Sequence, residues 1–166
     1  MQIRKANAED ADQACQVVRR SIAELCQADH QGDAHTLTLW LANKTAESMR
    51  RWITQNHVFV ATEGKTILGV GAIRSSGEIM LNYVSPDARL RGVSKALVAR
   101  LEAQASESGA DVVTLQSSAT ARQFYRCAGY AGTGPPVKGF GITLGYVMAK
   151  RLSSAQPTVA QEAHEC

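Results

Sequence analysis

Residues 82–97 have the residue types and the order of a segment that binds a negatively charged ligand. An apolar strand ending near Val84 leads into a short turn with Arg89 and Arg91, and a helix begins directly after Gly92. The first turn of a helix has backbone N–H groups without partners, and the helix macrodipole adds partial positive charge there. Gly92 has no Cβ, so a ligand can approach the backbone closely. The stretch therefore predicts a phosphate or pyrophosphate site.

Two common phosphate-binding loops do not fit this stretch. A Walker loop needs Lys and Ser/Thr directly after its second glycine, whereas Gly92 is followed by Val93, Ser94 and Lys95. A dinucleotide-binding turn needs three glycines between strand and helix, and this turn has one. A Gly-x-Gly pair at 69–71 lies inside a predicted strand with no helix after it.

Strands and helices are both predicted on either side of this turn. Hydrophobic periodicity predicts strands over 2–5, 58–62, 66–74, 78–84, 112–116 and 142–150, and helices over 11–25, 37–41, 45–53, 93–109 and 118–127. Residues 78–84 are apolar on both faces, which predicts a central strand. The fold class is therefore α/β (α+β), a mixed central sheet flanked by helices. One domain is expected over 1–152, followed by a polar, disordered tail over 153–166.

Composition narrows the possible partners. The chain has 166 residues, 45% of them hydrophobic, with a net charge of +3. Such a small excess without a basic run does not favour nucleic acid. The spacing of the four cysteines is not that of a zinc site, so no metal is expected. The N-terminus has no apolar leader and no stretch is long enough to span a membrane, so the expected location is cytoplasmic.

Two stretches carry a resemblance to a known family. Residues 89–94 resemble the pyrophosphate loop R/Q-x-x-G-x-G/A of the GNAT superfamily of acetyl-CoA-dependent N-acetyltransferases, with Ser94 at the last position. Residues 118–130 resemble the family's N-x-x-A-x-x-F-Y-x-x-x-G-F/Y helix, with Ser118 in place of Asn. The predicted element order is also that of the GNAT fold, so the resemblance covers about residues 3–152.

The resemblance implies where acetyl-CoA binds. Backbone amides from Leu90 to Ser94 would contact the pyrophosphate, and the pantetheine arm would pair with the strand end at Tyr83 and Val84 as an added strand does. A backbone N–H near Asn82 would face the thioester oxygen. The expected acetyl-CoA contacts are Asn82, Tyr83, Val84, Arg89, Leu90, Arg91, Gly92, Val93, Ser94, Ser118 and Tyr125.

Two residues are candidates for proton transfer. Tyr125 is the predicted general acid, because a phenol is protonated at neutral pH and can protonate a departing thiolate. The alternative is an ordinary core aromatic. Glu78 opens the central strand, where the histone-acetylating branch of the family has a glutamate, and it would share a strand face with Asn82. It is a candidate base; the alternative is a solvent-exposed charge after a turn.

The acceptor substrate is less sharply indicated. Asp29, His30 and His35 lie in the segment that lines the acceptor pocket in this family, and the alternative is a solvated loop. Trp40 is expected in the core. No charge pattern in residues 26–44 names a substrate.

Three functions remain in view. The leading hypothesis is an N-acetyltransferase that moves an acetyl group to a primary amine of a small molecule or peptide, by direct attack in a ternary complex. Alternatives are a non-catalytic acyl-CoA-binding sensor on the same fold and a domain that binds another phosphoanion or a nucleotide. A homodimer is a possible assembly.

Overall fold

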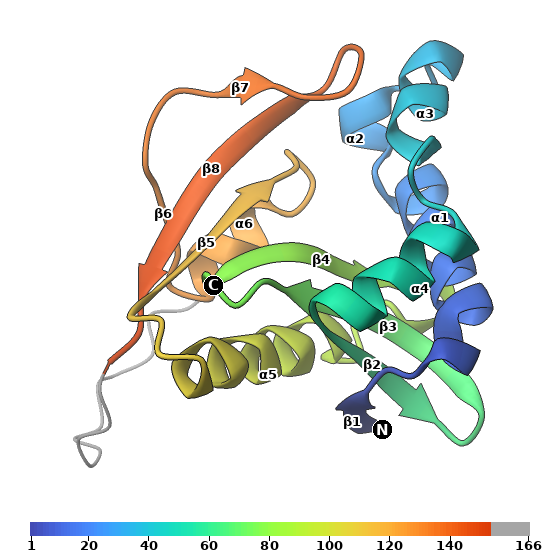
Figure 1. Cartoon of the computed structure of the whole chain (residues 1–166). Helices are drawn as coiled ribbons and strands as arrows, with labels where there is room; N and C mark the ends of the chain where they lie inside the picture. Colours follow the sequence, from blue (N-terminus) through green and yellow to red (C-terminus); the bar gives the residue numbers. More distant parts are fainter. Residues whose placement is uncertain (154–166) are drawn as a thin grey trace.

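The computed structural model describes residues 1–153, which form one mixed sheet with helices on both faces (Figure 1). The strands are β1 (Gln2–Lys5), β2 (His57–Glu63), β3 (Thr66–Ile73), β4 (Glu78–Val84), β5 (Val112–Ser117), β6 (Ala131–Gly132), β7 (Val137–Lys138) and β8 (Leu144–Arg151). The helices are α1 (Ala11–Leu25), α2 (Gln27–His30), α3 (Ala34–Leu41), α4 (Ala46–Gln55), α5 (Val93–Glu107) and α6 (Arg122–Cys127), with 3₁₀ turns η1 (Ala8–Asp10) and η2 (Pro86–Ala88).

The strand order is β1-β2-β3-β4-β5-β8-β6, with β7 paired to β8. The predicted central place of residues 78–84 is confirmed, since β4 lies between β3 and β5. The β4–β5 pair is parallel, whereas the other strand pairs in the described chain are antiparallel. The helix α5 connects β4 to β5, as a crossover between parallel strands requires.

Each face of the sheet has its own core. On one face, α1 packs on β3 and β4, and α4 packs beside it; buried Val18, Ile22 and Met49 lie there. On the other face, α5 packs on β2, β3 and β4 through Leu97 and Leu101. The predicted α/β (α+β) class with a mixed, flanked sheet is therefore confirmed.

The Gly-x-Gly pair of β3 serves helix packing. A Cβ built on Gly69 would lie 2.6 Å from Val93 Cγ1, and one on Gly71 would lie 3.1 Å from Leu101 Cδ1. The absence of side chains at both positions lets α5 approach the sheet closely. The start of α5, which carries the predicted anion site, is thereby fixed against β3.

Some element boundaries differ from the predicted ones. The helix predicted from residue 118 begins at Arg122. Ser118 Oγ accepts from the Ala121 N–H (3.2 Å) as an N-cap would, but the Arg122 N–H bonds the Ala119 carbonyl (3.4 Å), so residues 119–121 form a turn before the helix. The short α2 lies partly in a predicted turn, and β6 and β7 lie in or beside a predicted flexible connection. The predicted tail over 153–166 falls outside the described residues, apart from Ser153.

Candidate functional site

The turn between β4 and α5 has the conformation of an anion-binding loop. Leu90 (φ 59°) and Gly92 (φ 77°) both adopt left-handed backbone angles, and α5 begins at Val93 without a side-chain N-cap. The first N–H groups of α5 are therefore not satisfied by a capping side chain. The loop is tied to α1 by an ion pair between Arg20 Nη1 and Asp87 Oδ2 (2.7 Å).

A cavity of about 350 Å³ opens over this loop. Its lining includes the predicted residues Val84, Arg89, Leu90, Gly92, Val93 and Ser94, together with Leu25, Ala88, Lys95 and Phe124. The structure thus brings together most of the expected pyrophosphate contacts. Arg91 is an exception, because its guanidinium turns to Glu63 (Nη2 to Oε1, 2.9 Å) and is not in the lining. Lys95 was missed, although a basic residue in the first helical turn was a visible signal.

Strands β4 and β5 diverge to form a cleft. They pair at two positions, Glu78 with Thr114 and Ile79 with Leu115, and part beyond them. The β5-facing backbone groups of Met80–Val84 are left without a strand partner, so an extended ligand could pair with them. A cavity of about 320 Å³ lies in the opening.

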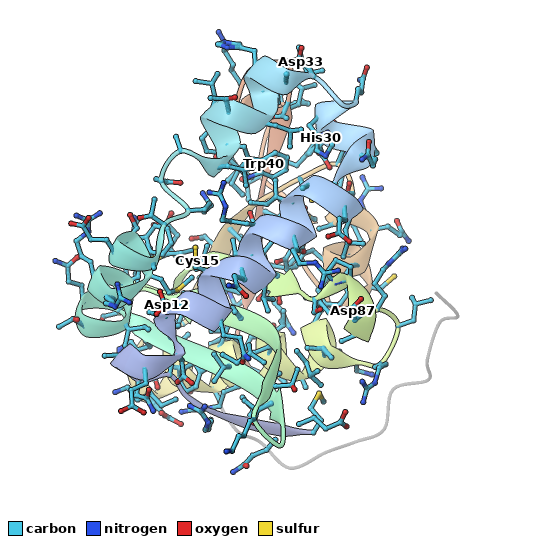
Figure 2. The ribbon with its side chains drawn as sticks, turned by 90° about the vertical axis from the view of Figure 1, so that its right-hand side faces the viewer. Asp12, Cys15, His30, Asp33, Trp40 and Asp87 are labelled. Atoms are coloured by element: carbon cyan, nitrogen blue, oxygen red, sulfur yellow. The ribbon has the colours of Figure 1, made fainter. Side chains whose placement is uncertain are left out.

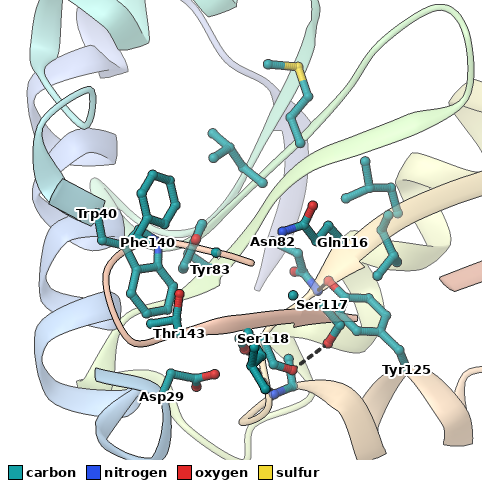
Figure 3. Close-up of a pocket in the computed structure, with 18 of the residues that line it drawn as sticks. Asp29, Trp40, Asn82, Tyr83, Gln116, Ser117, Ser118, Tyr125, Phe140 and Thr143 are labelled. Atoms are coloured by element: carbon teal, nitrogen blue, oxygen red, sulfur yellow. Dashed lines mark hydrogen bonds between the residues drawn. The ribbon is translucent and has the colours of Figure 1, made fainter. Parts of the chain in front are cut away.

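This cleft contains the other predicted contacts. Its lining includes Asn82, Tyr83, Ser118 and Tyr125. Figure 3 shows Trp40 and Phe140 on one side of the cleft and Tyr125 on the other, with Tyr83 between them. Residues that are far apart in the sequence therefore enclose one site.

Tyr125 is held with its hydroxyl at the cleft. The residue is 5% exposed, and Asn82 Nδ2 donates a hydrogen bond to Tyr125 Oη (3.2 Å). Burial raises the pKa of Tyr125 to about 12, against the lowering effect of the hydrogen bond from Asn82. Because the phenol oxygen accepts from Asn82, its own proton remains available for a ligand.

Asn82 has one polar atom without a partner. Its Oδ1 is buried and makes no hydrogen bond in the described structure. Buried amide oxygens are normally paired, because an unsatisfied one costs about 1–3 kcal/mol. This enclosed oxygen belongs to a residue that lines the cleft beside Tyr125.

Glu78 is not brought to either cavity. Its carboxylate, 46% exposed, forms an ion pair with Arg74 at the outer end of β4. Neither cavity has Glu78 in its lining. The predicted base therefore stands apart from Tyr125 and Asn82 in this structure.

Asp29, His30 and His35, the candidates for substrate contact, lie in different environments. His30 is fully buried, and its ring joins the Ile22 carbonyl (Nε2, 3.2 Å) and the Gly32 N–H (Nδ1, 3.0 Å), which is a structural role. In Figure 2, His30 lies among the helices at the end of α1. His35 is exposed on α3 and lines neither cavity.

Asp29 lines the cleft but is already engaged. Its carboxylate accepts from the Ala119 N–H (2.6 Å), the Thr120 N–H (3.2 Å) and the Thr120 hydroxyl. It therefore ties α2 to the turn before α6 and shapes the floor of the cleft.

The aromatic wall of the cleft, formed by Trp40 and Phe140, was not predicted from the sequence. Trp40, expected in the core, is buried yet lines the cleft, and its ring stacks on Phe140 (centroids 5.9 Å apart, planes at 16°). Lys44 lines the same cleft. No local pattern joins α3 to the β7–β8 hairpin, so the sequence carried no signal for this contact.

Residues 1–153 contain neither a cluster of metal ligands nor a membrane-spanning helix. No three His, Cys, Asp or Glu side chains gather there as metal ligands would. No helix in the same range is long and apolar enough to cross a membrane.

Comparison with known proteins finds one matching protein family and similar solved structures. Residues 26–152 match the model of the acetyltransferase (GNAT) domain. A comparison with curated protein sequences finds no significant match.

Among solved structures, an N-acetyltransferase from Rhodopseudomonas palustris is similar, with 25% identity, a TM-score of 0.82, and 91% of this chain and 95% of that chain covered. The PaiA N-acetyltransferase from Thermoplasma acidophilum, in complex with coenzyme A, has 18% identity, a TM-score of 0.75 and coverages of 91% and 98%. An aminoglycoside 6′-N-acetyltransferase complexed with coenzyme A has 16% identity, a TM-score of 0.72 and coverages of 95% and 100%.

Proposed function

The chain belongs to the GNAT acetyltransferase family, and from this premise we propose that it transfers an acetyl group from acetyl-CoA to a primary amine of a small molecule or peptide. The amine attacks directly while both substrates are bound in a ternary complex. The proposal rests on one observation above all, the adjacency of the two cavities along β4 and α6.

Neighbouring residues on two elements line the two cavities in turn. On β4, Val84 lines the loop cavity and Tyr83 lines the cleft; on α6, Phe124 lines the loop cavity and Tyr125 lines the cleft. A long ligand anchored at the α5 N-terminus can therefore run past Val84 and Phe124 and present its far end at Tyr125. Coenzyme A, with a pyrophosphate at one end and a thiol at the other, has that form.

The residues present fit the donor. Arg89 and Lys95 add positive charge beside the α5 N-terminus, and a Cβ built on Gly92 would meet no atom within 4 Å. Two phosphates of a pyrophosphate suit such a cluster of amides and cations. The unpaired edge of β4 offers backbone groups to the amides of the pantetheine arm.

In the proposed reaction, Tyr125 protonates the leaving group. Bound acetyl-CoA supplies an acetyl group activated as a thioester. The neutral amine attacks; as the bond from its nitrogen to the acetyl carbon forms and the carbon–sulfur bond breaks, Tyr125 Oη gives its proton to the sulfur. The proton lost from the amine nitrogen passes to water, and the Tyr125 phenolate takes a proton back from solvent. Asn82 Nδ2 fixes the hydroxyl, since it occupies one acceptor site of the oxygen. Positioned proton transfer contributes about 10²- to 10⁴-fold to a rate.

No dedicated base is assigned. Glu78 is paired with Arg74 and lines neither cavity, so the proposal gives it no role. In the proposal, Asn82 and Tyr125 face the incoming amine from the wall of the cleft. The expected oxyanion donor is a backbone N–H of β4 near Asn82.

An assay of thiol release tests the proposal. The purified chain is incubated with acetyl-CoA and a panel of primary amines and peptides, and acetylated products are identified by mass spectrometry. Turnover that depends on an amine and yields the N-acetyl product is expected. Acetyl-CoA binding without turnover on any amine would favour the non-catalytic sensor. Competition by ATP at least as strong as that by coenzyme A would favour the nucleotide-binding alternative.

A further inference from the structure

Lys44 is an unusual residue in the wall of the cleft. It lies between α3 and Thr45, the N-cap of α4, and its side chain is buried (7% exposed). Its backbone carbonyl accepts from Arg19 Nη1 (2.9 Å) and Cys15 Sγ (3.2 Å), both on α1. The main chain at Lys44 is thus fixed, and the side chain lines the cleft.

The ammonium group of Lys44 has no carboxylate partner among residues 1–153. Its Nζ donates to Asn43 Oδ1 (2.6 Å) and lies 5.5 Å from the centroid of the Phe140 ring. None of the ion pairs between described residues includes Lys44. The carboxylate that shares the cleft, Asp29, is engaged by Ala119 and Thr120.

Burial without an opposite charge is unfavourable for an ammonium. The pKa of Lys44 is lowered to about 8 by burial, so the group remains largely protonated at pH 7. A buried cation is normally paired, because desolvation penalises its charged form. An ammonium can donate three hydrogen bonds, and one of those of Lys44 is used by Asn43. The cleft therefore offers a bound anion both charge and donors.

We propose that the acceptor is a small molecule carrying both a primary amine and a carboxylate, and that Lys44 binds this carboxylate. The inference deepens the proposed function and rests on it. The amine then faces Asn82 and Tyr125, on the opposite side of the cleft from the Trp40–Phe140 pair (Figure 3). The stacked rings of that pair give a flat apolar surface for the part of the acceptor near its carboxylate. Polycationic amines are disfavoured by the same charge.

Matched pairs of acceptors test this inference. Phenylalanine is compared with phenethylamine, and β-alanine with ethylamine, so that each pair differs in the carboxylate alone. The carboxylated member is expected to have a kcat/KM at least tenfold higher after correction for the protonated fraction of each amine. Spermidine and phosphoethanolamine are added as polycationic and phosphate-bearing probes.

Variants at Lys44 separate charge from packing. Lys44→Met is expected to raise KM for the carboxylated acceptor at least tenfold with a small change in kcat, and to remove most of the discrimination within each pair. Lys44→Arg, which keeps the charge, is expected to retain the discrimination. Lys65→Met, the same substitution at an exposed hairpin position, is the control and should change neither value.

A readout without turnover completes the test. The thermal unfolding shift given by each probe is measured on the coenzyme A complex of the wild type and of Lys44→Met. A shift with carboxylated amines that is lost in Lys44→Met supports the inference. Any of three results would overturn it: equal use and equal binding of both members of each pair, a preference for the phosphate-bearing probe, or an equal loss of kcat/KM for both members in Lys44→Met. If acetyl-CoA itself fails to bind, the proposed function fails instead.

Discussion

At the scale of single residues, the proposed chemistry depends on the contact between Asn82 and Tyr125. The amide donates to the phenol oxygen, and burial keeps the phenol protonated. We expect Tyr125→Phe to lower kcat by about 10²-fold, the lower end of the range for positioned proton transfer. The dissociation constant of acetyl-CoA should change little. Steady-state kinetics and calorimetric titration measure the two quantities separately.

Tyr130→Phe is the matched control for that variant. The Tyr130 ring lies edge to face with Tyr125 at 5.5 Å, but its hydroxyl donates to Glu102 (2.9 Å) and lines neither cavity. Its kcat should stay near that of the wild type. Equal losses of kcat in the two variants, or a parallel loss of acetyl-CoA affinity in Tyr125→Phe, would contradict the acid role.

The charge of Lys44 predicts a pH dependence. Because its pKa is about 8, the cation is present below that pH and is lost above it. The charged neighbours are Arg19, which bonds the Lys44 carbonyl, and Asp29 in the same cleft; burial raises the pKa of Tyr83, which stays neutral. The preference for carboxylated acceptors should therefore decline as the pH rises through about 8.

Lys44→Arg supplies the reference for that pH profile. An arginine keeps its charge throughout the range, so its preference should stay flat once the ionisation of each amine is allowed for. A wild-type profile that is equally flat would contradict the role given to Lys44.

Single residues differed in how far the sequence revealed them. Short sequence motifs contain Arg89, Gly92 and Tyr125, and the residue types and spacing of these motifs indicate a binding or catalytic role. All three residues line the cavities of the structure. Lys44 and Phe140 meet only through the tertiary fold, across almost one hundred residues of chain. No local periodicity encodes such a contact, so this wall of the cleft could not be predicted.

At the scale of elements, the proposed donor site lies in the strand–loop–helix unit of β4 and α5. Gly92 is needed there for its left-handed backbone (φ 77°) and not because a side chain would collide with the protein. We expect Gly92→Ala to weaken coenzyme A binding about tenfold, because strain of about 1 kcal/mol or more opposes the binding conformation. Calorimetric titration gives the dissociation constants.

Gly64→Ala is the control for backbone strain alone. Gly64, in the β2–β3 turn, also has a positive φ (57°) and open space around its Cβ, but it lines neither cavity. It should lose similar stability and keep its coenzyme A affinity. Unchanged affinity in Gly92→Ala would place the donor elsewhere.

The long periodic elements and the short strand β1 were predicted well, whereas the two-residue strands were not. The strand Glu78–Val84 and the helix from Val93 follow from patterns of apolar residues that tertiary packing then satisfies. The two-residue strands β6 and β7 exist because β8 supplies their partner backbone. Residues 132–136, which run from the end of β6 to β7, are rich in Gly and Pro, which indicates a connection and not strands.

At the scale of the whole molecule, Asp29 joins distant parts of the chain. Its hydrogen bonds connect α2 to residues 119 and 120, ninety positions later. We expect Asp29→Ala to lower the free energy of unfolding by about 2 kcal/mol, because it removes charge-assisted bonds to backbone donors. Urea denaturation measures this loss.

Asp12→Ala serves as the control for that variant. Asp12 pairs with Arg50 at the surface and is 70% exposed, so its removal should change stability little. Equal effects of the two substitutions would show that Asp29 does not link the two regions. The fold class was predictable from element order, whereas this link depends on residues that sequence spacing cannot relate.

The central claim is that the cavity at the start of α5 and the adjoining cleft together hold acetyl-CoA. The most direct test is calorimetric titration of the purified chain with acetyl-CoA, with coenzyme A and ATP as comparators. We predict one site per chain with a dissociation constant in the micromolar range, and much weaker binding of ATP. Absence of acetyl-CoA binding, or ATP binding of equal strength, would contradict the account.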